Sequence, residues 1–428
     1  MARAYLEEGL TGSAVFQLFY RDLPGNRNYI VAYGVEDALD AVEHLAFSDD
    51  DLDYLATLPA FPQSFLDVLA DLRFTGSVRA VRDGTIIFPN EPIIEIEAPI
   101  VEAQILETIV LNRSHVGSVL ASKAARVVSA AAGRNVVDFG SRRAHGTDAA
   151  LMAARAGYVA GVAGTSNVLA GRLHGIPVVG TMAHSYVQAH DKETEALRRF
   201  AEIYPGTTLL VDTYDTLHGV REVVRLARRM GSDFTVGAVR IDSGDLIALS
   251  KETRRILDEG GLRDVSILVS GGLDEYAIRT ILDAGAPVDG FGVGTKMVVS
   301  KDAPDLDLAY KLVLYQDAPR IKTSPGKPIY PGRKQVLRRI ENGRMVGDRI
   351  VPAGSDTDGE SLLSTVMRDG RRVGDASAGI EAARLHCREQ LSLLPPELLA
   401  LETAMLPYPV ELSGSIRSAR RALTDELP

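Results

Sequence analysis

The chain has 428 residues and a mass of 46.1 kDa, with 46% hydrophobic and 24% charged residues. These values are typical of a soluble globular protein, and the length predicts two or three domains. The net charge of −10 argues against nucleic-acid binding, which usually needs a basic surface. No apolar stretch approaches the roughly 18 residues that cross a bilayer, and the acidic N-terminus lacks the layout of a signal peptide. The single cysteine, Cys387, fits a reducing compartment, so we expect a cytoplasmic protein without membrane or nucleic-acid partners.

Residues 1–107 are expected to form a β-rich N-terminal domain. A helix-like start is followed by two strand-like runs on either side of a turn at 24–26. Two short helices are expected within 51–73, broken by prolines, before more strands with tight turns. A longer helix over 101–128 leads into the next domain.

Residues 108–300 are expected to form the catalytic domain, an α/β barrel. From 135 to 299, short apolar runs recur, and each ends in polar or glycine residues, often before a helix-like stretch. Continuous apolar runs are typical of buried parallel strands, which need crossover connections. Polar residues after each strand place the chemistry at the strand C-termini, the active face of α/β barrels.

After residue 301 the parallel pattern stops. Short strands with proline and glycine turns predict an antiparallel meander, followed by a helix and a proline-rich stretch. We expect residues 301–428 to form a C-terminal extension of this kind.

Two glycine-rich strand ends predict a phosphate site. Gly271 and Gly272 follow one late strand, and Gly292 and Gly294 precede Thr295 at the end of the next. Such glycines can simply form tight turns. Two of these turns on adjacent strands, each opening a helix, favour instead an anion site made of backbone N–H groups. The sequence has no Walker motif, so a standard P-loop is excluded.

Two other strands end in paired carboxylates, Asp212 with Asp215 and Asp242 with Asp245. Carboxylates there could hold Mg²⁺ with its waters or stabilise a cationic transition state. Arg240 lies two residues before Asp242, so both project to the same side of an extended strand. This pair is either a structural ion pair or an arginine that faces an anionic substrate, and we favour the second interpretation.

Thr181 and His184 lie at the end of a further strand, beside Ser185. A lone histidine in such a place is more often a hydrogen-bonded core residue than a catalytic group. The neighbouring hydroxyl groups favour a functional role. No cysteine or glutamate completes a zinc site around this histidine.

Taken together and in order, several segments resemble the nicotinate phosphoribosyltransferase family of type II phosphoribosyltransferases. They are DFGSRRAHG, GTSNVLAG, GTMAHSYVQAH, VDTYDT, RIDSGDL, VSGGLDE, GFGVGTK and KTSPGKPIYPGRKQV. The resemblance covers about three quarters of the chain. It implies an irregular α/β barrel beside a split, mostly β domain, in which the C-terminal extension packs with the N-terminal domain. It also implies a homodimer with shared active sites. It also implies NAD salvage, in which nicotinate and phosphoribosyl pyrophosphate give nicotinate mononucleotide and pyrophosphate, with ATP hydrolysis coupled to turnover and Mg²⁺ as cofactor.

The resemblance further implies roles for individual residues. His184 matches the histidine that ATP phosphorylates, and Asp212 and Asp242 match catalytic carboxylates near the ribose and the metal. The remaining matches bind substrate or product: Thr181 and Arg240 hold nicotinate, Phe139 and Arg142 match the segment that stacks on and clamps the pyridine ring in the related nicotinamide enzyme, and Gly271, Gly272, Gly292, Gly294 and Thr295 form the phosphate site.

Ser166 bears on the choice of substrate. In the nicotinamide-using relative the matching position is an aspartate that binds the amide, and an aspartate would repel the carboxylate of nicotinate. The neutral serine therefore favours nicotinate. The family usually carries an Asp-Leu-Tyr motif just upstream of a segment like 1–12, and its tyrosine stacks on nicotinate across the dimer. This sequence begins about where that motif would end, so we expect either a start further upstream or a site without that aromatic wall.

Other functions stay open at this point. A nicotinamide phosphoribosyltransferase conflicts with Ser166, and a quinolinate phosphoribosyltransferase should need a denser cluster of arginine and lysine. An inactive, ligand-binding relative is a further possibility. A barrel lyase or isomerase that acts on a sugar phosphate would explain the glycine turns but would leave the other polar strand ends unexplained.

Overall fold

The computed structural model describes residues 1–324, 329–374 and 379–426. It contains two compact units, Met1–Ser122 with Asp305–Pro428, and Lys123–Pro304. The domain edges expected after residues 107 and 300 stay predictions. The family-like segment KTSPGKPIYPGRKQV spans 322–336, and its residues 325–328 lie outside the described part of the chain.

The first unit is built on a seven-stranded sheet around β1 (Ser13–Tyr20). β1 is rich in apolar and aromatic residues, and every residue after its first is buried. It pairs antiparallel with β12 (Leu308–Tyr315) on one side and with β5 (Pro92–Pro99) on the other. Across the first pairing, Phe16 stacks on Tyr310 with 4.9 Å between ring centroids. Segments from both ends of the chain therefore share one sheet and one core.

The other strands of this unit complete that sheet or form two smaller ones. In the seven-stranded sheet they are β3 (Ser77–Ala80), β13 (Ala318–Pro319), β17 (Ser364–Arg368) and β18 (Arg371–Arg372). The smaller sheets are β16 (Glu360–Ser361), β14 (Lys334–Glu341), β15 (Arg344–Pro352) and β19 (Val410–Leu412), and β2 (Ile30–Val31) with β4 (Ile86–Ile87). The helices are α1 (Ala2–Glu7), α2 (Val35–Glu43), α3 (Asp49–Ala56), α4 (Gln63–Asp71), α5 (Ile100–Ile105), α15 (Gly379–Leu393), α16 (Pro396–Leu399) and α17 (Gly414–Asp425).

The short helices and hairpins expected in this unit are present, but many strands pair with strands that are distant in sequence. Helices α3 and α4 confirm the two short helices within 51–73. The expected C-terminal meander is divided between two sheets, because β12 and β13 join the seven-stranded sheet whereas β14 and β15 form a hairpin in another. Turn residues identify such hairpins from nearby sequence. The sheet that each hairpin joins depends on distant partners such as β1.

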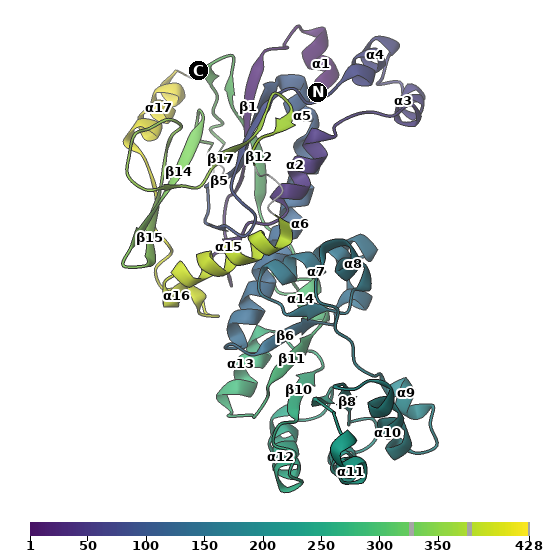
Figure 1. The fold of residues 1–428 in the computed structure, drawn as a ribbon. Coiled ribbons are helices and arrows are strands. Elements are labelled where there is room, and N and C mark those ends of the chain that lie inside the picture. The colour runs from purple at the N-terminus through teal and green to yellow at the C-terminus, as the bar shows by residue number, and fades with distance from the viewer. Residues whose placement is uncertain (325–328, 375–378, 427–428) are drawn as a thin grey trace. The chain divides into compact units, whose positions relative to one another are not determined.

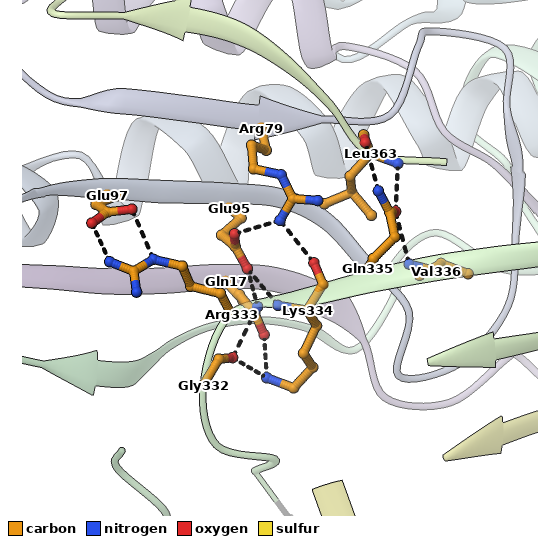
Figure 2. A network of polar contacts seen from close by, with 10 residues as sticks. All are labelled: Gln17, Arg79, Glu95, Glu97, Gly332, Arg333, Lys334, Gln335, Val336 and Leu363. Carbon is orange, nitrogen blue, oxygen red and sulfur yellow. Dashed lines mark hydrogen bonds and ion pairs between the residues drawn. The ribbon is translucent and has the colours of Figure 1, made fainter. Parts of the chain in front are cut away.

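A buried polar network joins β1, β3 and β5 to β14 (Figure 2), and we refer to Gln17, Arg79, Glu95 and Lys334 as the closed network. Lys334 Nζ donates to Gln17 Oε1 at 2.7 Å and to the carbonyl of Gly332 at 2.8 Å. Glu95 Oε1 accepts from Arg79 at 2.8 Å, and Oε2 accepts from the Lys334 backbone N–H at 3.0 Å. Burial lowers the pKa of Lys334 to about 7, although nearby Glu95 opposes this shift. The network therefore ties two sheets together at the cost of a buried amine.

The second unit contains a curled half-barrel sheet of six parallel strands in the order β7-β6-β11-β10-β9-β8 (Figure 1). The strands are β6 (Asn135–Asp138), β7 (Gly164–Thr165), β8 (Thr208–Leu210), β9 (Ala238–Ile241), β10 (Ser266–Ser270) and β11 (Gly290–Val293). All five pairings are parallel, and β11 returns to lie beside β6. The carboxyl ends of all the strands therefore meet at one edge, which confirms the α/β class and the placement of the polar strand ends.

Four strands lead into helices whose first turn is capped by an Asp or Asn side chain. The caps are Asn167 for α8 (Val168–His174), Asp215 for α11 (Thr216–Met230), Asp245 for α12 (Leu246–Glu259) and Asp274 for α13 (Glu275–Asp283). Each accepts a hydrogen bond from a backbone N–H of the first turn, which satisfies a donor that the helix leaves unpaired. Asp215 and Asp245, the second members of the two carboxylate pairs, therefore serve as helix caps.

The remaining helices of this unit connect and cover the sheet. They are the end of α6 (Glu107–Ala130), α7 (Thr147–Val159), α9 (His184–Gln188), α10 (Glu193–Ile203) and α14 (Thr295–Val298), with 3-10 turns η1 (Ser141–Arg143) and η2 (Gly231–Asp233). Helices α11 and α12 lie side by side (Figure 1). Within the described ranges, no helix combines the length and the apolar character needed to cross a membrane.

Candidate active site

Arg240, near the end of β9, is held by hydrogen bonds in three directions. Its Nη1 donates to Thr181 Oγ1 at 2.7 Å, and its Nε donates to Ser270 Oγ at 2.8 Å. Its Nη2 donates to Asp242 Oδ1 at 2.7 Å, and the Ser270 hydroxyl donates to the same oxygen. These partners come from the residue directly after β9, from the end of β10 and from the segment before α9, so the guanidinium plane is fixed at the carboxyl edge of the sheet. We call Thr181, Arg240, Asp242 and Ser270 the open network.

Asp212, the second residue after β8, extends the open network. Its Oδ2 accepts from the Asp242 backbone N–H at 3.0 Å and from the Ser243 hydroxyl at 2.6 Å. Its Oδ1 is buried and has no hydrogen-bond partner among the described residues. Buried polar atoms are nearly always paired in native proteins, so this oxygen marks a place where a ligand or ion can bind.

Asp242 is suited to remain ionised. Burial alone would raise its pKa, but hydrogen bonds from Ser270 and Arg240, with the charge of Arg240 and of nearby His184, hold the pKa of Asp242 below its ordinary value. The site therefore presents two neighbouring carboxylates beside one arginine. In the described part of the chain, no group of three or more His, Cys, Asp or Glu side chains converges as a metal cage. Mg²⁺ is usually held by one or two carboxylates together with water and substrate phosphate, so Asp212 and Asp242 fit it.

His184 begins α9 beside the open network. Its Nδ1 lies 3.2 Å from Thr213 Oγ1, and its Nε2 lies 3.9 Å from Asp242 Oδ2. The first distance permits a hydrogen bond and the second does not. The side chain is 40% exposed, so Nε2 is the nitrogen that is left for another partner.

Phe139 gives the site an aromatic surface. It follows β6, and the Cζ atom of Arg240 lies 5.4 Å from the centroid of its ring. A Cβ atom at Gly292 would lie only 2.7 Å from that ring, so glycine at this buried strand position makes room for Phe139. Arg142 lies nearby in sequence within η1 and is exposed.

A buried aspartate organises the start of this edge. Asp138 Oδ1 accepts from the Gly140 N–H at 2.7 Å, and Oδ2 accepts from Thr165 Oγ1 at 2.7 Å. Burial raises the pKa of Asp138, although both hydrogen bonds oppose the shift. The backbone N–H of Ser166 donates to the Asp138 carbonyl at 2.8 Å, which leaves the exposed Ser166 side chain at the end of β7.

The two glycine turns lie on neighbouring strands, with Ser270 of β10 in register with Gly292 of β11. Gly271 and Gly272 have φ values of +97° and +64°, and a Cβ atom at Gly271 would lie 2.0 Å from the Asp242 carbonyl oxygen. Only glycine accommodates this backbone conformation without strain. Both glycines are exposed, as is Thr295 at the start of α14.

The structure connects most of the residues selected from the sequence. Hydrogen bonds or close contacts join Phe139, Thr181, His184, Asp212, Arg240 and Asp242, and Gly271 and Gly292 lie against members of this set. Arg142, Ser166 and Thr295 are exposed within a few residues of the ends of strands of the same sheet. Four contributors escaped sequence reasoning, namely Asp138, Thr213, Ser243 and Ser270. Each is a short polar residue at or just after the end of an apolar run, which was the only available signal.

Comparisons with known proteins identify the family of the chain. The model of the nicotinate phosphoribosyltransferase N-terminal domain matches residues 1–113, and the model of the nicotinate phosphoribosyltransferase family matches 134–325. A nicotinate phosphoribosyltransferase of Mycobacterium tuberculosis is 54% identical over 430 aligned residues, which cover 100% of this chain and 93% of the relative. The chain belongs to the nicotinate phosphoribosyltransferase family.

A further relative and two solved structures also match the chain over most of its length. The enzyme of that name from Bacillus subtilis is 41% identical over 82% of this chain and 74% of its own length. The crystal structure of human nicotinic acid phosphoribosyltransferase is 25% identical, with a TM-score of 0.87 over 99% of this chain and 98% of that chain. The nicotinate-nucleotide pyrophosphorylase from Pyrococcus furiosus is 28% identical, with a TM-score of 0.74 over 91% and 92% of the two chains. These matches confirm the expected barrel with a second, mostly β part.

Proposed function

We propose that this protein is a nicotinate phosphoribosyltransferase, which joins nicotinate to phosphoribosyl pyrophosphate in NAD salvage and couples the reaction to ATP hydrolysis. The observation that carries the proposal is the open network, in which an arginine is fixed beside two carboxylates at the carboxyl edge of a parallel half-barrel. The 54% identity to a relative of that name supports the same activity.

Arg240 is suited to bind the carboxylate of nicotinate. A guanidinium carries five N–H groups, and hydrogen bonds to Thr181, Ser270 and Asp242 use three of them. Among the described residues, the other two, one on each terminal nitrogen, have no acceptor, and a carboxylate can accept both. Phe139, beside Arg240, offers a face on which the pyridine ring can stack.

Asp212 and Asp242 are suited to the ribose and to Mg²⁺. The pyridine nitrogen of nicotinate attacks C1 of the ribose while the bond from C1 to pyrophosphate breaks, and positive charge develops on the sugar. Two carboxylates beside C1 stabilise that charge, and the nitrogen needs no base because it is already unprotonated near neutral pH. When bound, Mg²⁺ would offset the negative charge of the pyrophosphate leaving group. The backbone of Gly271, Gly272 and Gly294 with Thr295 would hold the phosphate that stays on the ribose.

His184 is the residue that we assign to ATP. Its Nδ1 lies beside the Thr213 hydroxyl, so Nε2 is the nitrogen that would accept the phosphoryl group. A phosphoryl group on Nε2 would add negative charge next to Asp242 and compete with it for Arg240. ATP hydrolysis can thereby alter the affinity of the neighbouring nicotinate site.

The proposal is tested by incubating the protein with nicotinate and phosphoribosyl pyrophosphate, with and without ATP, and measuring nicotinate mononucleotide by chromatography. We expect product from nicotinate and little or none when nicotinamide or quinolinate replaces it. The variant His184→Ala should form product at a basal rate without stimulation by ATP. Wild-type protein that forms no nicotinate mononucleotide would contradict the proposed activity, and full ATP stimulation of His184→Ala would contradict only the role of His184.

We also propose a cytoplasmic homodimer with shared active sites, as the family resemblance implies. Light scattering at several protein concentrations tests the dimer. A mixture of two inactive variants, one altered in each unit of the chain, tests the sharing, because activity returns only if each copy supplies what the other lacks.

A further inference from the structure

An ion pair connects the two glycine turns. Lys296 Nζ lies 2.6 Å from Asp274 Oδ2. Lys296 follows Thr295 after β11, and Asp274 comes two residues after Gly272 at the end of β10. Because β10 and β11 are neighbours in the sheet, this ion pair directly joins the turn after one strand to the turn after the next.

A second, buried set of ion pairs holds the residue that follows Asp274. Glu275 Oε2 lies 2.5 Å from Lys123 Nζ, and its Oε1 accepts from Arg126 Nε at 3.1 Å. Lys123 also lies 2.6 Å from Asp302 Oδ1. The Lys123 and Glu275 side chains are only 2% and 0% exposed. Buried ion pairs therefore join α6 to the first residue of α13.

The formal charges of this arrangement balance. The three cations are Lys123, Arg126 and Lys296, and the three carboxylates are Asp274, Glu275 and Asp302. Burial alone would raise the pKa of Asp274, but the hydrogen bonds from Lys296 and the Ala277 N–H hold it below its ordinary value. Taking so many charges out of water costs about as much as their attraction returns, and well-packed apolar residues would be at least as stable. Stability alone therefore does not explain the cluster.

The glycine turns need support from elsewhere. Gly271 and Gly272 both have positive φ values and no side chains with which to hold their own conformation. Glycine has more conformational freedom to lose than any other residue, so an unsupported turn of this kind is mobile. A phosphate that bridges two turns requires them at a fixed separation.

We propose that the Lys296–Asp274 ion pair, supported by Lys123, Arg126 and Glu275, is a positioning device that sets the separation of the two glycine turns for the phosphate of phosphoribosyl pyrophosphate. The inference rests on the proposed function, in which these turns bind that phosphate. These residues do not touch the substrate. They act by holding the backbone N–H groups that do.

The test is the variant Lys296→Met, measured by the KM for each substrate. Lys296 is chosen because its side chain is 32% exposed, so its loss does not leave a fully buried charge without a partner. We expect the KM for phosphoribosyl pyrophosphate to rise about tenfold, because small misplacements of binding groups carry such effects, and the KM for nicotinate to change less than about twofold. Lys296→Arg should restore most of the affinity. Asp274→Asn should behave like Lys296→Met, because asparagine caps a helix as well as aspartate does and only the charge is lost.

Arg254→Met is the matched control. Arg254 pairs with Asp258 within α12 at 2.8 Å, and its side chain is 21% exposed, so the pair resembles Lys296–Asp274 in length and accessibility. The ion pair lies within one helix. The other hydrogen bonds of Arg254, to the carbonyls of Leu262 and Val265, hold the loop after that helix and reach neither of the two phosphate turns. Its removal should leave both KM values unchanged.

The outcomes separate the two proposals. If the wild-type protein forms no nicotinate mononucleotide, the proposed function and this inference both fail. If the wild-type protein is active and Lys296→Met keeps its KM for phosphoribosyl pyrophosphate, only the inference fails. An equal rise in both KM values, or the same rise in Arg254→Met, would indicate a merely structural ion pair and would likewise overturn it.

Discussion

The open network of the second unit and the closed network of the first contain the same kinds of groups but differ in whether those groups are all paired within the protein. Both place a cation beside a carboxylate and an uncharged polar side chain. In the closed network, Lys334 is 3% exposed, and both oxygens of Glu95 are occupied (Figure 2). In the open network, the Arg240 side chain is 15% exposed and His184, beside it, is 40% exposed. Asp212 Oδ1, next to them, has no partner in the described part of the chain.

The difference teaches how to tell a structural network from a functional one. A network in which the protein satisfies every group has no capacity left for a ligand, and its role is to join the elements that carry it. A network with unused donors and acceptors at the carboxyl edge of a parallel sheet is incomplete until a ligand binds. Substitutions should therefore act on stability in the closed network and on catalysis in the open one.

The largest effect is expected from Arg240→Met. Removing one partner of a hydrogen-bonded charge pair at a binding site costs about 2–5 kcal/mol, so kcat/KM for nicotinate should fall by roughly 30- to 4,000-fold. Arg240→Lys should recover only part of this loss, because lysine cannot present the paired N–H groups of a guanidinium. Steady-state kinetics with nicotinate measure the effect, and thermal melting measures stability, which should change little. A variant that lost stability but kept its kcat/KM would place Arg240 with the structural networks.

Arg79→Met in the closed network should give the reverse result. Arg79 is the ion-pair partner of the buried Glu95, and its loss leaves that carboxylate with fewer partners. Breaking such a pair should lower the free energy of unfolding by about 2–3 kcal/mol, as measured by urea denaturation. At temperatures well below melting, kcat/KM for nicotinate should stay within about twofold of the wild-type value. A large loss of activity in the folded variant would mean that the closed network also serves the site.

The two networks also differ in how far the sequence predicts them. Arg240 and Asp242 lie two residues apart at a strand end, and their contact follows from the geometry of a single strand. Ser270 and Thr181 join them only because β10 lies beside β9 and the segment before α9 returns to the same edge, which no local pattern states. The closed network is assembled from four separate segments, so none of its contacts could be predicted. The sequence pattern also selects residues that have a structural role. Asp215 and Asp245 follow strand ends as Asp212 and Asp242 do, but they cap helices.

A smaller effect is expected from Ser166→Asp. Ser166 is exposed at the end of β7, so an aspartate side chain fits there without disturbing the core. Its charge should repel the nicotinate carboxylate and lower kcat/KM for nicotinate about tenfold, because a repulsion of roughly 1.4 kcal/mol corresponds to one factor of ten. Ser166→Asn, which has the same shape without the charge, is the control and should change kcat/KM for nicotinate much less. Equal kinetics for the wild-type protein and Ser166→Asp would remove Ser166 from the nicotinate site.

The smallest effect is a pH dependence that only the closed network should show. The pKa of Lys334 is about 7 in the folded protein, against an ordinary value of 10.5. Between these pH values the unfolded chain binds a proton at Lys334 that the folded protein does not, so the free energy of unfolding rises with pH. The destabilisation by the buried charge is fully present below about pH 7 and is lost towards pH 10.5.

Urea denaturation from pH 6 to pH 9 measures this dependence. Above pH 7, the free energy of unfolding should rise with pH more steeply in the wild-type protein than in Lys334→Met, by about 1 kcal/mol per pH unit. Arg240→Met should leave this slope unchanged, because a guanidinium stays protonated over the whole range. Equal slopes in the wild-type protein and Lys334→Met would mean that Lys334 keeps its charge on folding, and this difference between the two networks would then be absent.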